Sequence, residues 1–115
     1  MSRVKRGTNS NKRRKNVLAK AKGFRFGRST KFIQAKEAVA HAGVNAFRDR
    51  KRKKREFRGL WNIKIGAGLL PFELAYSKFI DALKKNNIAL NRKVLSEIAE
   101  EAPETFAKIV VQVKG

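Results

Sequence analysis

The sequence predicts an all-α protein in which a long basic N-terminal helical extension joins a small C-terminal helical domain. Good helix formers dominate the chain, and its only prolines are Pro71 and Pro103. Apolar residues in the C-terminal half recur at helical spacing, whereas the N-terminal half is rich in Lys and Arg. We therefore expect residues 1–58 to form the basic extension and residues 59–115 to form the globular domain.

The positive charge is concentrated in the first half. The 115 residues include 29 Lys or Arg and 9 Asp or Glu, which gives a formal net charge of +20. Residues 1–58 hold 21 of the basic and three of the acidic side chains, and only 19 of these 58 residues are apolar. Such a segment cannot offset its ordering entropy by burying its own surface. We expect it to need a polyanionic partner.

The chain is expected to begin with a tail, a short helix and a turn. Residues 2–11 follow no hydrophobic period and are predicted to be extended. Residues 12–22 form the short helix, and Gly23 stands where a glycine commonly ends one. Residues 24–27 then form a turn that carries two aromatic side chains.

One long helix is predicted from about residue 30 to about residue 70, with Ser29 or Thr30 as its N-cap. Its middle, Arg48–Glu56, covers more than two turns without an apolar residue on any face. This stretch cannot pack against the rest of its own chain. Beyond it an apolar face at the spacing i, i+3, i+4 and i+8 should enter the globular domain, and it consists of Phe57, Leu60, Trp61 and Ile65.

Three short helices are predicted after residue 70. The first begins near Ser77 and ends at Asn86. Asn91 is expected to cap the second, and Pro103 suits the first turn of the third. The third is ambiguous, because residues 109–111 are also typical of a strand. The core is predicted to be anchored by Trp61 and to consist of Trp61, Phe79, Leu83, Leu95 and Ile98.

No active site is predicted. The chain has no Cys and one His, which excludes disulfides, Cys/His zinc sites and thiol nucleophiles. His41 has no nucleophile beside it, and Ser77 lacks a Gly-x-Ser-x-Gly context. Carboxylates at helical spacing can serve acid–base or metal chemistry, but we interpret this group as a solvated helix face; it consists of Glu97, Glu100, Glu101 and Glu104. We expect no enzyme activity, metal or cofactor.

The distribution of basic residues predicts a nucleic-acid interface, with RNA favoured over DNA. A major-groove reader usually presents one short helix, whereas a tail, a turn and a long helix that is basic on all sides suit burial among several phosphate backbones of folded RNA. For Phe24 and Phe26 the sequence supports base stacking and local hydrophobic packing equally, whereas Tyr76 is assigned to the core. The predicted RNA-binding residues are Arg3, Lys5, Arg6, Lys12, Arg13, Arg14, Lys15, Lys22, Phe24, Arg25, Arg28, Arg48, Arg50, Lys51, Arg52, Lys54, Arg55 and Arg58.

Three other functions can be compared with this one. A histone-like DNA-compacting protein would share the charge, and it is the main alternative. A peptide lying on a membrane would need one apolar face, which Arg48–Glu56 lacks. A nuclease would need metal-binding carboxylates near the basic surface, but the acidic cluster lies in the other half. No apolar run approaches 18 residues and no secretory signal is apparent, so we expect a soluble intracellular protein.

Several motifs resemble the L20 family of bacterial large-subunit ribosomal proteins. The resemblance covers essentially the whole chain in order, and the block from Arg48 to Trp61 is its most specific part. The other matching motifs are residues 3–7, 21–24, 76–80 and 92–99. The resemblance implies a helical extension threaded into large-subunit ribosomal RNA and a small all-helical C-terminal domain. It also implies direct RNA binding early in subunit assembly, neighbouring ribosomal proteins as partners, and a cytoplasmic location in the large subunit.

The chain departs from the family pattern after Trp61. Lys64 stands where the family usually has Arg, which keeps the charge but loses a bidentate fork. Gly66 and Gly68 replace Asn and Ala and are expected to weaken the end of the long helix. Asn91 replaces the usual Asp, which is equivalent as an N-cap.

Overall fold

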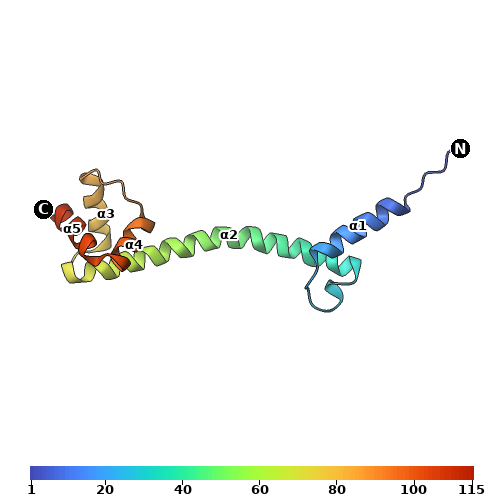
Figure 1. Ribbon diagram of the computed structural model, residues 1–115, viewed down its shortest axis with the longest axis horizontal. Helices are drawn as coiled ribbons and strands as arrows, with labels where there is room; N and C mark the ends of the chain where they lie inside the picture. Colours follow the sequence, from blue (N-terminus) through green and yellow to red (C-terminus); the bar gives the residue numbers. More distant parts are fainter. The chain divides into compact units, whose positions relative to one another are not determined.

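The computed structural model describes residues 1–115 and contains helices and no strands, which confirms the predicted all-α class (Figure 1). Two 3₁₀ turns, Phe26–Arg28 and Leu70–Phe72, accompany the helices. The chain divides into two compact units, Met1–Lys51 and Arg52–Gly115, which are described separately below. The α-helices are α1 (Gly7–Lys20), α2 (Phe32–Leu69), α3 (Tyr76–Lys85), α4 (Arg92–Glu101) and α5 (Pro103–Lys114).

Helix α1 begins earlier than the sequence predicts. Residues 7–11 were expected to be extended, but the helix starts at Gly7 and the Ser10 N–H donates to the Arg6 carbonyl over 3.1 Å. Backbone hydrogen bonding can extend a helix through polar residues that have no apolar period, because adding a residue to an existing helix costs less than nucleating a new one. At its other end the chain turns through Gly23, whose φ of +90° is readily adopted by glycine.

The start of α2 also differs from the prediction. Ser29 does not cap it, because the Ser29 hydroxyl donates to the Phe26 carbonyl over 2.9 Å and so belongs to the preceding 3₁₀ turn. The first backbone bond of α2 runs from the Ala35 N–H to the Lys31 carbonyl over 2.8 Å. The helix therefore begins one to two residues later than a cap at Ser29 or Thr30 would place it, and it ends at Leu69.

The core of the second unit forms where α3, α4 and α5 gather around the C-terminal end of α2 (Figure 1). Phe79 and Phe106 lie at its centre, with ring centroids 5.7 Å apart and planes inclined by 55°. Burial of one apolar face explains why α5 is a helix despite its β-branched run. The buried core residues are Ile65, Leu69, Phe79, Leu83, Leu95, Phe106, Val110 and Val113.

Trp61 differs from its predicted place in this core. It is only partly buried and is not a member of the core cluster; its ring centroid lies 6.3 Å from that of Phe57, which is itself exposed. Ile65, one turn later, is the first fully buried residue of the second unit, so α2 enters the core there. Phe79, Leu83 and Leu95 are buried, and Ile98 packs against them while remaining partly exposed.

Polar contacts set the ends and flanks of the short helices. The Asn91 side chain accepts a hydrogen bond from the Val94 N–H over 2.9 Å, which confirms it as the N-cap of α4. The partly buried Tyr76 donates its hydroxyl hydrogen to Asn62 Oδ1 and accepts a hydrogen bond from Arg92 Nε, each over 2.8 Å. Lys64 forms an ion pair with Glu100, which joins α2 to α4.

Candidate nucleic-acid interface

The predicted basic contact residues are all exposed. Those of the first unit lie on the segment before α1, on α1 itself and on the loop that follows. Helix α1 has no fully buried residue, and Val17 and Leu18 are only partly covered. The charge of these elements therefore faces solvent, where phosphate groups can reach it.

A second group of basic residues lies on α2, within a stretch that has no buried side at all. Every residue from Ala40 to Leu60 is exposed. Two carboxylates interrupt the positive charge: Asp49 accepts from Arg48 Nε over 3.2 Å, and Glu56 accepts from Arg52 Nε over 2.8 Å. Each contact holds a guanidinium group in a defined direction, and exposed pairs of this kind contribute little to stability.

An aromatic side chain within this stretch was not predicted as a contact residue. Phe47 is 58% exposed, and Lys51 Nζ lies 4.5 Å from the centroid of its ring. The Arg50 guanidinium lies 6.0 Å from the same centroid. Phe47 therefore holds two cations by cation–π contact. The sequence signal was a lone aromatic residue immediately before the basic run that begins at Arg48, a pattern that is common on helix surfaces.

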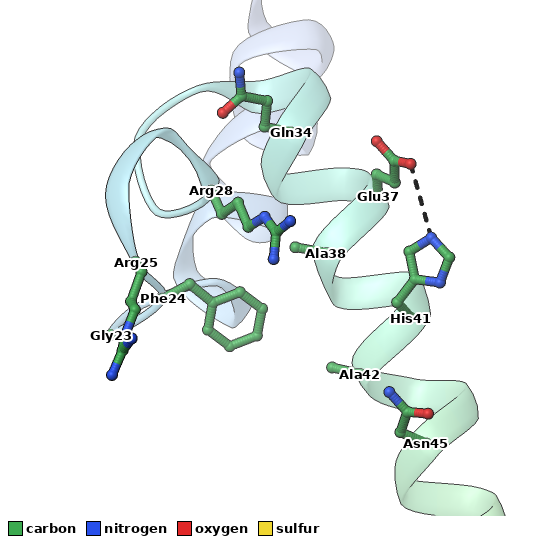
Figure 2. Close-up of a pocket in the computed structure, with 10 residues that line it drawn as sticks. All are labelled: Gly23, Phe24, Arg25, Arg28, Gln34, Glu37, Ala38, His41, Ala42 and Asn45. Carbon is green, nitrogen blue, oxygen red and sulfur yellow. Dashed lines mark ion pairs between the residues drawn. The ribbon is translucent and has the colours of Figure 1, made fainter.

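A pocket of about 910 Å³ lies in the first unit, between the loop after α1 and one face of α2 (Figure 2). The partly buried Phe24 projects its ring from the loop towards α2, where Ala38 and Ala42 present only methyl groups. The Arg28 guanidinium points towards the same face, whereas Arg25 points away from it (Figure 2). The pocket is lined by Gly23, Phe24, Arg25, Arg28, Gln34, Glu37, Ala38, His41, Ala42 and Asn45.

Only some of the residues that line this pocket were predicted from the sequence. Phe24, Arg25 and Arg28 were predicted as contact residues, but Gln34 and Asn45 were not. Ordinary polar residues on a helix give no signal that a distant loop will fold over them. His41 sits at the rim, with Nε2 3.7 Å from Glu37 Oε1.

The acidic cluster of the second unit has the character of a solvated surface. Glu100 pairs with Lys64, and Glu97 lies 3.9 Å from Lys93 Nζ. No group of three or more His, Cys, Asp or Glu side chains is arranged to hold a metal ion. On α3, a hydrogen bond from the Lys85 ammonium to Asp81 and the charge of that carboxylate raise the pKa of the lysine.

None of the helices is both long enough and apolar enough to cross a membrane. The exposed stretch of α2 carries charged side chains around its whole circumference and lacks the single apolar face of an interfacial helix.

Comparison with known proteins gives matches over nearly the whole chain. The family model described as Ribosomal protein L20 matches residues 3–109. A relative from Bradyrhizobium sp. (strain ORS 278), named Large ribosomal subunit protein bL20, is 52% identical over 115 residues, which cover 100% of this chain and 97% of the relative. Relatives of the same name from Ralstonia pickettii (strain 12J) and Borrelia turicatae (strain 91E135) are 51% and 46% identical over 100% of this chain and 98% and 100% of their own lengths.

Proposed function

The chain belongs to the ribosomal protein L20 family, and we propose that, as a structural constituent of the large ribosomal subunit, it binds large-subunit ribosomal RNA directly and promotes early subunit assembly. In this proposal residues 1–58 are the RNA-binding extension and residues 59–115 are the domain that fixes where the extension starts. The proposed partners are ribosomal RNA and neighbouring large-subunit proteins, in the cytoplasm. The role is structural, and no enzyme activity is proposed.

The observation that carries the proposal is the uninterrupted exposure of Ala40–Leu60. A helix of this length without a buried side gains nothing from packing on its own chain, and its conformation depends on a partner. Basic side chains on every face match a partner that surrounds the helix. Phosphate groups of several RNA helices would supply such an environment, with Arg side chains forking onto phosphate oxygens.

The mechanism that follows is electrostatic clamping. Each Lys or Arg that neutralises a phosphate releases condensed counterions, so binding gains free energy at low salt. Specificity then depends on whether the phosphates of the folded RNA match the positions of the basic side chains, more than on base sequence. Joining separate RNA helices through one extension would favour their assembly into a compact subunit.

A competition assay tests this function. The full-length protein is bound to folded large-subunit RNA at moderate salt, and duplex DNA is added in equal concentration of phosphate. Ribosomal RNA is expected to be retained, because only the folded RNA presents phosphates around the whole helix. Equal displacement by the duplex would instead support the histone-like alternative, for which charge alone suffices.

A further inference from the structure

We propose that the pocket beside Phe24 receives one unpaired base of the bound RNA strand. The inference rests on the proposed function, since it names what one part of the RNA-binding surface recognises. It goes beyond phosphate neutralisation, because it assigns a defined place to a neutral, planar group.

The shape of the pocket favours a flat ligand. The ring of Phe24 lines the pocket on the side of the loop, and Ala38 and Ala42 line it on the side of α2 (Figure 2). A base held in the pocket would stack on the ring beside the apolar surface of these methyl groups. Stacking of unpaired bases on aromatic side chains is the usual way in which proteins hold single-stranded segments of RNA.

The polar side chains of the rim favour a base over a phosphate. Gln34 and Asn45 each offer a donor and an acceptor, and Arg28 offers only donors. Glu37 adds a negative charge beside the pocket, which disfavours a phosphate there; its carboxylate is directed towards His41, with Oε1 3.7 Å from His41 Nε2 (Figure 2). The first unit has only one other acidic residue, Asp49, so a carboxylate at this pocket stands out against an otherwise basic surface.

The loop is held in place before any ligand binds. Gly23, with φ of +90°, allows the chain to turn, and the Phe24 N–H donates to the Ala21 carbonyl over 3.1 Å. A Cβ atom added at Gly27 would lie 2.4 Å from Gln34 Oε1, so the loop lies against the Gln34 side chain there. Because the loop that carries Phe24 is already ordered, it loses less conformational entropy when a ligand binds than a flexible loop would.

A pair of matched substitutions on α2 tests the proposal. Ala42→Leu fills the slot that faces Phe24, whereas Ala40→Leu makes the same change at an exposed position that does not line the pocket. Neither alters the charge, and both keep a good helix former at an exposed site. Fluorescence anisotropy measures the affinity of each full-length variant for a single-stranded oligoribonucleotide and for an abasic oligomer with the same number of phosphates.

The expected result is a loss confined to the oligomer that carries bases. Ala42→Leu should weaken its binding by roughly 5- to 150-fold, the range for the loss of one stacked base, and leave the abasic oligomer unaffected. Phe24→Leu should do the same, while Phe24→Tyr and Ala40→Leu should bind like the unmodified protein.

Two outcomes would overturn the proposal that the pocket binds a base, without contradicting the proposed function. One is an equal effect of Ala42→Leu and Ala40→Leu, and the other is a loss that is the same for both oligomers. In either case binding to large-subunit RNA would persist. Failure of the unmodified protein to prefer folded ribosomal RNA in the competition assay would count against the function itself.

Discussion

At the scale of single residues, the two glycines near the end of α2 have different surroundings. A Cβ atom added at Gly66 would meet nothing within 4 Å, whereas one at Gly68 would lie 3.1 Å from Phe106 Cε1 and 3.2 Å from Ala99 Cβ. Gly68 therefore allows α4 and α5 to approach α2 closely. Both glycines were expected only to weaken the helix. Gly66 fits that expectation, whereas Gly68 also makes room for Phe106 and Ala99.

Gly66→Ala is expected to stabilise the protein by about 1 kcal/mol, the difference in helix propensity between the two residues. Gly68→Ala should gain less or destabilise, because the buried Phe106 ring has to move to admit the methyl group. Urea unfolding followed by circular dichroism measures both changes. Equal stabilisation by the two substitutions would show that Phe106 shifts without cost.

Trp61 and Phe79 should differ in what their truncation costs. Phe79→Ala is expected to destabilise the fold by about 3–5 kcal/mol, because its ring is fully buried at the centre of the core. Trp61→Ala should cost less, on the order of 1–2 kcal/mol, because only part of the indole leaves water. The same unfolding measurement ranks the two variants, and a larger loss for Trp61→Ala would contradict its place outside the core.

At the scale of elements, α2 changes character along its length. From Ile65 onwards it carries core residues of the second unit, whereas Ala40–Leu60 has no buried side. Local openings follow the amount of burial, so hydrogen bonds in the exposed stretch should break far more often than those in the core.

Hydrogen exchange of the full-length protein checks this difference. Amides of residues 40–60 are expected to exchange much faster than those of Leu95 and Phe106, and to become protected when large-subunit RNA is added. The core amides serve as the internal reference. Strong protection of residues 40–60 without RNA would mean that the helix is stable alone and that its order does not come from a partner.

Most of the elements could be predicted from the sequence, and the misses have physical causes. The long helix, the Asn91 cap and the helices after residue 70 follow from propensity, spacing and capping chemistry. The start of α1 was missed because backbone hydrogen bonding overrode the low propensity of Thr, Asn and Ser. Ser29 was misplaced because a hydroxyl can close a 3₁₀ turn as well as cap a helix.

The candidate interface was only partly predictable for a related reason. Positive charge is visible in composition, so the basic residues of the extension could be proposed without a structure. The pocket requires the loop at Gly23–Arg28 to fold back on α2, and no periodicity in the sequence encodes that approach. The partial exposure of Trp61 could not be predicted either, because the spacing of apolar residues does not show at which turn a helix enters a core.

At the scale of the whole molecule, charge and core occupy different parts of the chain. The unit Met1–Lys51 contains 16 Lys or Arg and two acidic residues, while the buried core cluster runs from Ile65 to Val113. Substitutions of basic residues in Met1–Lys51 should therefore leave the stability of the core intact, and substitutions in the core should leave the positive charge of Met1–Lys51 intact.

Replacing Arg48 and Arg50 together by Gln is expected to weaken RNA binding and to flatten its salt dependence. The slope of log affinity against log salt should fall by about 2, because each phosphate that is no longer neutralised in a duplex-like site lowers it by about 0.9. The unfolding free energy should stay unchanged, because both side chains are exposed and far along the sequence from the core. An unchanged slope would mean that neither guanidinium group neutralises a phosphate.

The order of the two parts along the chain has a consequence for synthesis. Translation produces the basic segment first, and the last buried residues, Phe106, Val110 and Val113, only at the end. While the chain is still growing, the basic segment is complete and the buried core is not. A chain cut short before Phe106 would thus keep nearly all of the excess positive charge and lose the packing that makes it a folded protein.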